Sequence, residues 1–251
     1  MEEIKEQKEG EITKKDLNRI NFKFELATII LKRMGYNNFI KKIIELPQDK
    51  IGILNSIKYD ECLFLIYSSK TFKKIKQFEF HFNDVVKMED NSLVLSNEYN
   101  IYYYELKDNE YKLIQTIQCY ENEKDEYYSH PFRYERDPNT SILSIHALKN
   151  GNLIVKSIKQ MKLYKKDNGK FLYSKTVNFE YYISTIFEIK PNIIVLFLQE
   201  RLGSGCVVTG FNYFMSLYDI KNDKKNIIGQ RTDYLIDDYY NTKPFLKIDN
   251  N

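Results

Sequence analysis

Few side chains in this sequence are of the types that carry catalysis or bind metals. The chain has three histidines and three cysteines, and none shows the C-x-x-C or H-x-x-x-H spacing typical of zinc sites. A catalytic pair such as Cys119 with His130 would be adjacent only in space, so spacing along the chain neither indicates nor excludes it. We interpret His81, which lies between two phenylalanines, and His146 as structural or exposed side chains. No metal ion is expected, and no residue is assigned to catalysis.

Carboxylates are numerous, but they lie scattered in turn-like segments such as Glu89-Asp90 and Asp237-Asp238. Acidic residues in such segments usually form a solvated surface. A glycosidase needs two carboxylates that face each other across a cleft, and the spacing does not reveal such a pair. The chain is therefore not expected to be an enzyme.

A glycine-rich segment, residues 202–210, begins like a dinucleotide-binding fingerprint. Four residues separate Gly205 from Gly210, where the fingerprint has two, and residues 211–218 are aromatic and strand-like. A phosphate site of that kind needs the amino end of a helix at this point. We interpret residues 199–213 as a long hairpin and expect no cofactor.

A charged, aromatic segment at residues 120–140 is the strongest candidate for a partner-binding loop. Tyrosine and arginine are enriched in interaction hot spots, and long loops on a rigid scaffold often carry function. An ordinary solvated excursion is the alternative interpretation. The candidate protein-binding residues are Tyr127, Tyr128, His130, Arg133, Tyr134 and Arg136.

Positive charge is not segregated along the chain. The net charge is +3, from 38 basic and 35 acidic residues. A basic patch beside tyrosines could bind single-stranded nucleic acid, but strand-edge lysines that prevent aggregation explain the same residues. Nucleic acid is therefore not expected as a partner. The lysines in question are those of residues 70–76 together with Lys156, Lys159, Lys162 and Lys165.

The composition favours β-structure. The chain has 251 residues, enough for one large or two small domains, and contains 21 tyrosines and 16 phenylalanines against only two alanines. The longest apolar run, residues 193–198, is far shorter than the roughly 20 residues that span a bilayer. The charged amino terminus lacks an apolar signal region, and three cysteines suit a reducing compartment. These features predict an all-β, cytoplasmic protein with no membrane association.

A repeat runs along the chain. Each unit has an apolar residue, a polar turn, a strand, a second turn, a strand with an aliphatic-tyrosine pair, and a further strand-like run. The strand anchors Ile51, Leu93, Leu153 and Ile193 are 42, 60 and 40 residues apart, and the longer step contains the insertion at 120–140. A step near 40 residues with four short strands is typical of propeller blades. The pairs are Ile66-Tyr67, Ile101-Tyr102, Leu163-Tyr164 and Leu217-Tyr218.

This pattern resembles the WD-repeat family of β-propellers over roughly residues 43–230. The nearest match to the family's strand ending is residues 217–220, with Tyr218 in place of the usual tryptophan. The chain has no tryptophan and no Gly-His dipeptide, so the structural hydrogen-bond network of that family has no counterpart. The resemblance implies a β-propeller-like array of four to five four-stranded blades and a scaffolding role.

The ends of the repeat leave two questions open. Residues 14–35 show both helical spacing and strand-like alternation, so a partial blade and a capped helix are both possible, with the partial blade favoured. Four units with terminal fragments suit either a small closed ring or an open arc. We divide the chain into a charged amino-terminal segment (1–19), a repeat domain (20–240) and a tail (241–251).

The function expected from the sequence is a non-catalytic scaffold that binds another protein through its loops and blade surface. That expectation follows from the family resemblance and from the absence of a catalytic motif. A hydrolase or lyase with its site at the central opening is the alternative, and weak binding of single-stranded nucleic acid is a third possibility.

Overall fold

The computed structural model describes residues 39–58, 61–121, 141–202 and 209–234, and throughout these ranges the chain is built of β-strands. Sixteen strands form four four-stranded antiparallel sheets, and no helix occurs among the described residues. The prediction of an all-β protein is confirmed. The structural alternatives for residues 14–35 lie outside the described residues.

Each sheet is a meander of four consecutive strands. Sheet 1 contains β1 (Phe39–Leu46), β2 (Lys50–Lys58), β3 (Glu61–Ser68) and β4 (Lys74–His81). Sheet 2 contains β5 (Asp84–Lys87), β6 (Leu93–Ser96), β7 (Asn100–Lys107) and β8 (Glu110–Gln118). Sheet 3 contains β9 (Ser144–Ala147), β10 (Leu153–Lys156), β11 (Gln160–Asp167) and β12 (Lys170–Asn178). Sheet 4 contains β13 (Tyr182–Lys190), β14 (Ile193–Leu202), β15 (Gly210–Asp219) and β16 (Lys224–Tyr234).

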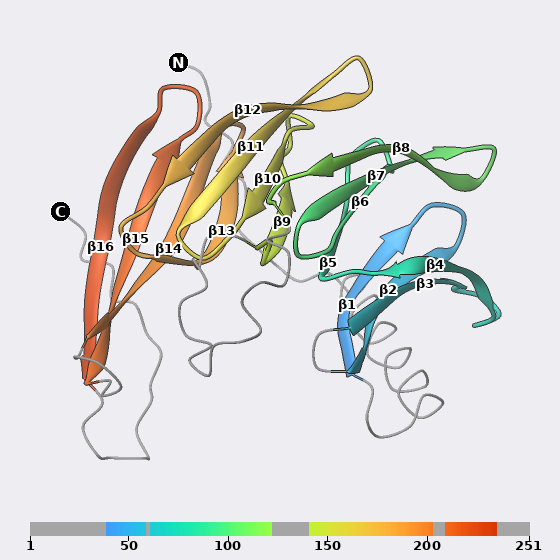
Figure 1. Cartoon of the computed structure of the whole chain (residues 1–251), viewed down its shortest axis with the longest axis horizontal. Coiled ribbons are helices and arrows are strands. Elements are labelled where there is room, and N and C mark those ends of the chain that lie inside the picture. Colours follow the sequence, from blue (N-terminus) through green and yellow to red (C-terminus); the bar gives the residue numbers. More distant parts are fainter. Residues whose placement is uncertain (1–38, 59–60, 122–140, 203–208, 235–251) are drawn as a thin grey trace, which may run out of the picture.

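The four sheets lie side by side in an arc, in the order of the chain, with sheet 1 at one end and sheet 4 at the other (Figure 1). The first strands of sheets 1, 2 and 3 approach each other, because β5 contacts both β1 and β9. The last strands, β4, β8, β12 and β16, lie at the opposite edges of their sheets. Hence the first strands form the inner side of the arc.

Turn residues of the required conformation close the outer hairpins. Asp108 and Asn109 between β7 and β8 have φ values of 52° and 66°, and Asn168 and Gly169 between β11 and β12 have 46° and 73°. Two successive residues with positive φ form a type I′ turn, whose twist matches that of the flanking strands. Asn, Asp and Gly tolerate this conformation best, which explains why these polar pairs interrupt the strand-like runs.

Hydrophobic side chains fill the spaces between adjacent sheets. In β6, Leu93 and Leu95 pack toward sheet 1, whereas Val94 packs toward sheet 3, and all three are 0% exposed. Sheets 3 and 4 meet in the same way through a cluster that contains Ile154 and Tyr218. A lone four-stranded sheet cannot bury its apolar surface, so stacking of successive sheets accounts for the arrangement.

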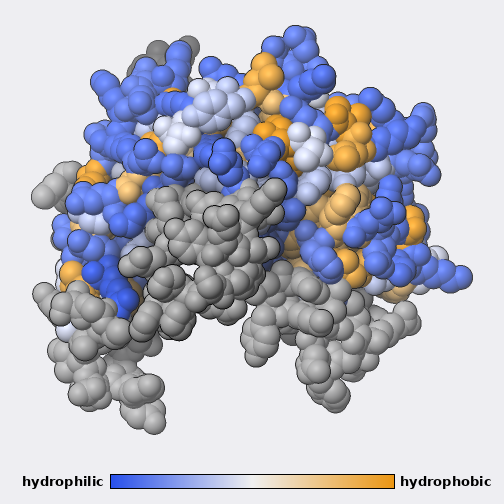
Figure 2. Space-filling view, viewed as in Figure 1, coloured by the Kyte–Doolittle hydropathy of each residue, from blue (hydrophilic) through white to orange (hydrophobic). Residues whose placement is uncertain are grey.

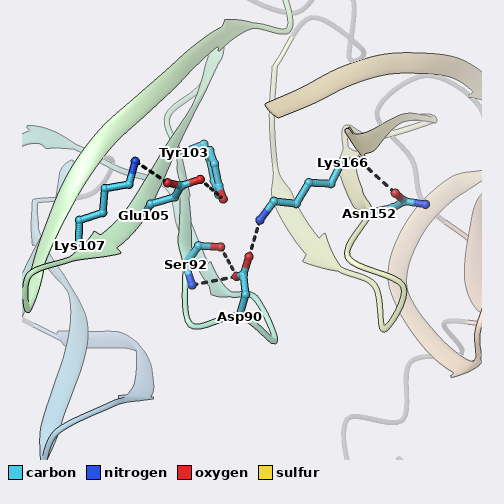
Figure 3. A network of polar contacts seen from close by, with 7 residues as sticks. All are labelled: Asp90, Ser92, Tyr103, Glu105, Lys107, Asn152 and Lys166. Atoms are coloured by element: carbon cyan, nitrogen blue, oxygen red, sulfur yellow. Dashed lines mark hydrogen bonds and ion pairs between the residues drawn. The ribbon is translucent and has the colours of Figure 1, made fainter. Parts of the chain in front are cut away.

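A polar contact also joins sheets 2 and 3 near the surface. Lys166 on β11 pairs with Asp90, in the turn before β6, with 2.5 Å between Nζ and Oδ2 (Figure 3). Ser92 donates its backbone N–H to Asp90 Oδ1 over 3.0 Å. Although partial burial acts against the charge, the hydrogen bonds from Lys166 and Ser92 hold the pKa of Asp90 below its ordinary value. Lys166 also lies over the ring of Tyr103, 4.7 Å from its centroid.

In sheets 2 and 3 the strand register confirms the repeat and corrects one of the predicted pairs. Leu93 faces Tyr104 across β6 and β7, just as Leu153 faces Tyr164 across β10 and β11, so the 60-residue step relates equivalent positions. The equivalent of Tyr164 is therefore Tyr104, and the predicted pairing with Tyr102 was wrong by two residues. Three consecutive tyrosines leave the local pattern ambiguous, because only the hydrogen-bonded register decides which one matches.

Candidate functional site

The inner side of the arc forms an open groove of about 850 Å³ that the first strand of every sheet lines. Residues of β1, β5, β9 and β13 contribute most of its surface, and Lys156 of β10 adds one side chain. On the face shown in Figure 2, hydrophilic residues predominate, and hydrophobic ones gather mainly in the right half, over sheets 1 and 2. The groove is the natural candidate for a site, because binding sites are concave and few per protein.

The strand register arranges the groove-lining residues in three bands. Glu45, Lys87, Ala147 and Glu188 face equivalent positions at the start of the second strands, so they share one level, called here the charged band. One residue earlier in each strand lies the apolar band, formed by Ile44, Val86, His146 and Phe187. Three residues before the charged band lies the tie band, formed by Lys42, Asp84, Ser144 and Thr185.

The Asp84 carboxylate in the tie band connects three sheets. Its Oδ1 accepts hydrogen bonds from Lys42 Nζ on β1 and from the Val85 N–H, each over 2.8 Å. Its Oδ2 accepts the Ile145 N–H of β9 over 3.0 Å. The side chain is only 11% exposed. Asp84 therefore holds sheets 1, 2 and 3 together at the inner edge of the arc.

Lys156 makes the corresponding connection between sheets 3 and 4. Its Nζ donates to the carbonyl oxygens of Ile183 over 2.8 Å and of Ser184 over 3.3 Å. The residue is 7% exposed, and burial lowers the pKa of its ammonium group below the ordinary value. The amine and the Asp84 carboxylate are thus both engaged in holding the sheets together.

His146 lies in the apolar band and is half-buried. Its Nε2 is 3.0 Å from Ser144 Oγ. Burial lowers the pKa of His146 to about 4; Asp84 acts in the opposite direction, and the charges of Lys42 and Lys156 add to the lowering. The imidazole is consequently neutral at pH 7.

Acidification is expected to weaken the fold through His146. Above its ordinary pKa of 6.5 the imidazole is neutral in both the folded and the unfolded chain, so its full contribution is present there. Between that pH and about 4 only the unfolded chain takes up the proton, and the free energy of unfolding falls by up to about 3 kcal/mol. Urea unfolding at several pH values measures this slope. The His146→Asn variant should show a flatter pH dependence, and equal slopes in the two proteins would contradict the assignment.

Glu188 in the charged band has one carboxylate oxygen without a partner. Its Oε2 accepts the Lys149 N–H over 2.6 Å. Its Oε1 is buried and has no hydrogen-bond partner in the structure. A buried acceptor without a donor is costly, and because this atom is buried it is not exposed to the groove.

The candidate protein-binding residues and the Cys119–His130 pair are not among the residues that line the groove. All six candidate protein-binding residues, 127, 128, 130, 133, 134 and 136, lie outside the described residues. Because His130 is one of them, its pairing with Cys119 also lies outside the described residues. Cys119 is buried and accepts a hydrogen bond at Sγ from the Tyr164 hydroxyl over 3.2 Å. Burial raises the pKa of this thiol, so it is a packed, protonated side chain. His81 is exposed at the end of β4.

The lysine run of β10 and β11 does not form one basic face. Lys156 is buried in the groove, Lys162 lies 3.8 Å from the centroid of the Tyr120 ring, and Lys159 lies 4.8 Å from that of Tyr182. Only Lys165 of this run is exposed. The lysines thus serve mainly to join or cover neighbouring parts of the protein.

Within the described ranges there is no side-chain cluster that could bind a metal ion and no helix that could span a membrane. Among these residues, no group of three or more His, Cys, Asp or Glu side chains is arranged to hold a metal ion. Within the same ranges, no helical segment has the length and apolar character that a membrane span requires. After the glycine-rich segment the chain enters strand β15, which pairs with β14 from Leu202 and Gly210 onward. The strands on either side of the segment thus pair antiparallel, whereas residues 203–208 lie outside the described residues.

Sequence reasoning missed the groove residues Lys42, Asp84 and Glu188. A signal was present, because the repeat continues upstream of Leu46, Met88 and Leu148, each of which is buried where the first hairpin of its sheet begins. Extending the repeat by four residues toward the amino terminus would have aligned Lys42, Asp84 and Ser144.

Comparisons with known proteins indicate the fold alone. No protein-family model and no curated protein matches the chain. A functionally unknown protein from Desulfotomaculum acetoxidans matches 76% of this chain and 56% of its own, with a TM-score of 0.50 and 8% identity. Two extracellular domains from B. thetaiotaomicron, of BT4673 and BT3049, also match 76% of this chain; they have TM-scores of 0.45 and 0.46 and identities of 14% and 12%. The chain spans 22% and 23% of those two chains.

The comparisons correct the predicted location. The chain was expected to be cytoplasmic, whereas the solved B. thetaiotaomicron structures that it resembles are extracellular domains. The cytoplasmic prediction is therefore withdrawn. No location replaces it, because similarity at this level of identity concerns the fold.

Proposed function

We propose that this chain is a propeller-like, non-catalytic module that binds a segment of another protein in the groove between its inner strands. The observation that carries the proposal is that the first strands of all four sheets line one open groove of about 850 Å³. Blade-like sheets whose inner strands surround a common opening are the design of propellers. The four described sheets form an arc (Figure 1).

The chemistry of the groove suits a polypeptide. Its lining combines apolar side chains with charged and hydroxyl groups, so a bound segment can make both apolar contacts and hydrogen bonds. Its charged lining residues are balanced, three basic and three acidic: Lys42, Lys87, Lys156, Glu45, Asp84 and Glu188. A polyanion such as nucleic acid needs an excess of positive charge, which this lining does not offer.

The Asp84 carboxylate and the Lys156 amine are already hydrogen-bonded within the protein, which supports a non-catalytic role. Asp84 accepts three hydrogen bonds, and Lys156 donates to two backbone carbonyls. A general base or a nucleophile must be free to contact the substrate, and neither group is. Both act as connections between sheets.

Selection from a phage-displayed library of random peptides, with the full chain as bait, tests the proposal. Selected peptides should lose about tenfold or more in affinity for the Phe187→Ser variant, because an apolar contact of this size contributes about 1.5–3 kcal/mol. Phe187 is 56% exposed, so the fold should tolerate the change. The matched control is Tyr173→Ser on the outer strand β12, where the side chain is 59% exposed. Equal affinities for wild type and Phe187→Ser would contradict a groove site.

The insertion at residues 120–140 is proposed as a second contact element. Replacing Tyr127, Tyr128, Arg133 and Tyr134 by alanine should weaken capture of a partner and leave the circular-dichroism spectrum unchanged. Unaltered capture would remove these residues from the binding surface.

A hydrolase is the second candidate, favoured by the 3.0 Å separation of Ser144 Oγ and His146 Nε2 within the groove. A serine nucleophile needs a base of this kind. The lowered pKa of His146, about 4, makes the imidazole a weak base at neutral pH, which favours the binding role. A fluorophosphonate probe that labels the wild type but not Ser144→Ala would establish the hydrolase, and an unlabelled wild type would exclude this mechanism.

A further inference from the structure

The face of sheet 4 that points away from sheet 3, called here the end face, carries apolar side chains. Val195 pairs with Leu217 across β14 and β15, and Phe197 pairs with Met215. Ile194, between them in the strand, packs against sheet 3, and successive side chains of a strand point to opposite faces. The four side chains are partly exposed, and none belongs to a hydrophobic cluster between described sheets. Sheet 4 lies at the end of the arc, so no sheet of the described ranges covers this face (Figure 1).

The repeat indicates that such a face is built for burial. Tyr218 in sheet 4 corresponds to Tyr164 in sheet 3, because each faces the first buried residue of the preceding strand. The equivalent pairs are therefore Leu217 with Leu163 and Met215 with Met161. In sheet 3 this leucine and this methionine are 4% and 0% exposed, because they pack against sheet 4. Sheet 4 presents the same surface without a following sheet among the described residues, so the surface that fits it is the apolar face of another β-sheet.

We propose that the end face packs against the end face of a second copy of this chain. Strands β14 and β15 have ten residues each. At about 3.3 Å per residue and about 4.8 Å between strands, four strands of this length present a face of about 600 Å². Two such faces would bury about 1,200 Å², which reaches the range of stable interfaces. A two-fold axis brings identical patches together, so one apolar face per copy suffices.

The opposite end of the arc argues against copies that stack head to tail. Such stacking would place the end face of one copy on sheet 1 of the next. The corresponding face of sheet 1 carries Ile51 and Ile53, which are 4% and 0% exposed. These side chains are already buried, whereas two end faces use only surface that is exposed. The four side chains of the end face do not line the groove, so this inference is independent of the proposed function.

Gly229 provides a position at which the end face can be altered without loss of a packed side chain. It pairs with Met215 across β15 and β16, and a Cβ added to it would lie 3.7 Å from Met215 Cε, an ordinary van der Waals distance. We therefore expect the Gly229→Glu variant to fold. Because burial of an unpaired charge is costly, the substitution should weaken the dimer about tenfold or more. The matched control is Tyr173→Glu on β12, where the side chain is 59% exposed and the dimer should be unchanged.

Sedimentation velocity of the full chain over a range of micromolar concentrations measures the association. We expect a monomer–dimer equilibrium in the wild type, and a monomer in Gly229→Glu at concentrations where Tyr173→Glu still dimerises. Methionine methyl groups labelled with ¹³C locate the interface by NMR. On dilution of the wild type the Met215 signal should shift, whereas that of Met161, which is 0% exposed, should not.

Three results would overturn the proposal. The first is a wild type that stays monomeric at these concentrations. A soluble paramagnetic agent that fails to broaden the Met215 signal of such a monomer would show that the chain itself covers the end face. The second is a dimer that Gly229→Glu does not weaken, and the third is a dimer whose Met215 signal does not move on dilution. Should Gly229→Glu not fold, dilution of the wild type still decides, and each of these results leaves the groove proposal standing.

Discussion

A Leu153→Ala variant is expected to lose about 2–5 kcal/mol of its free energy of unfolding, because the substitution leaves a cavity in a closely packed core. Leu153 is 0% exposed and lies in the cluster between sheets 2 and 3, together with Tyr103 and Phe171. Since the residue anchors the second strand of its sheet, the cavity would open between sheets rather than within one. Urea unfolding followed by circular dichroism measures the change.

The comparison for this prediction is Leu172→Ala on β12. That leucine is 52% exposed, so its truncation should change the free energy of unfolding by less than about 0.5 kcal/mol. A Leu153→Val variant, with a smaller cavity, keeps the measurement possible should the alanine variant not fold. Similar effects at positions 153 and 172 would show that the space between sheets 2 and 3 is not a packed core.

Removal of the Asp84 carboxylate is expected to cost about 2–4 kcal/mol, because it leaves a buried amide without its acceptor and a lysine without its counter-charge. In the Asp84→Ala variant the Ile145 N–H loses a 3.0 Å bond and Lys42 loses a 2.8 Å ion pair. Asp84→Asn keeps an oxygen for the amide but not the charge, so its cost should be intermediate. Chemical unfolding of both variants at pH 7 gives the two values.

An exposed ion pair provides the control for Asp84. Lys70 and Asp49 are 2.6 Å apart, but their side chains are 73% and 57% exposed. The Asp49→Ala variant should therefore change the free energy of unfolding by less than about 1 kcal/mol. If Asp84→Ala were as mild as Asp49→Ala, the carboxylate would not hold the first three sheets together.

Much of the fold could be predicted because the repeat depends on local chemistry. The turn before β10 contains Gly151 at a φ of 80°. Leu148, the apolar residue with which this unit of the repeat begins, is buried. Such turn and core positions recur at fixed offsets, so spacing alone locates the strands that follow them. The register of β7 could not be predicted, because Tyr102, Tyr103 and Tyr104 are all buried and offer no alternation.

The site was harder to predict than the fold, and the reason is physical. Strands β5 and β9 have only four residues each, and one side of them faces the groove, so their hydrophobic pattern is weak. The tie band places lysine, aspartate, serine and threonine at one level of successive sheets. Different chemistries at equivalent positions produce no sequence motif, and only the paired register brings Lys42, Asp84 and Ile145 together.

Amide chemical-shift mapping of the ¹⁵N-labelled chain, titrated with a selected peptide, is the decisive measurement. If the inner strands of four stacked sheets line one binding groove, shifts should appear together in four separate segments, around residues 42–45, 84–87, 143–148 and 184–188. The outer strands β4, β8, β12 and β16 should remain unchanged. Shifts confined to one inner segment, or concentrated on the outer strands, would contradict both the groove and the arrangement of sheets that forms it.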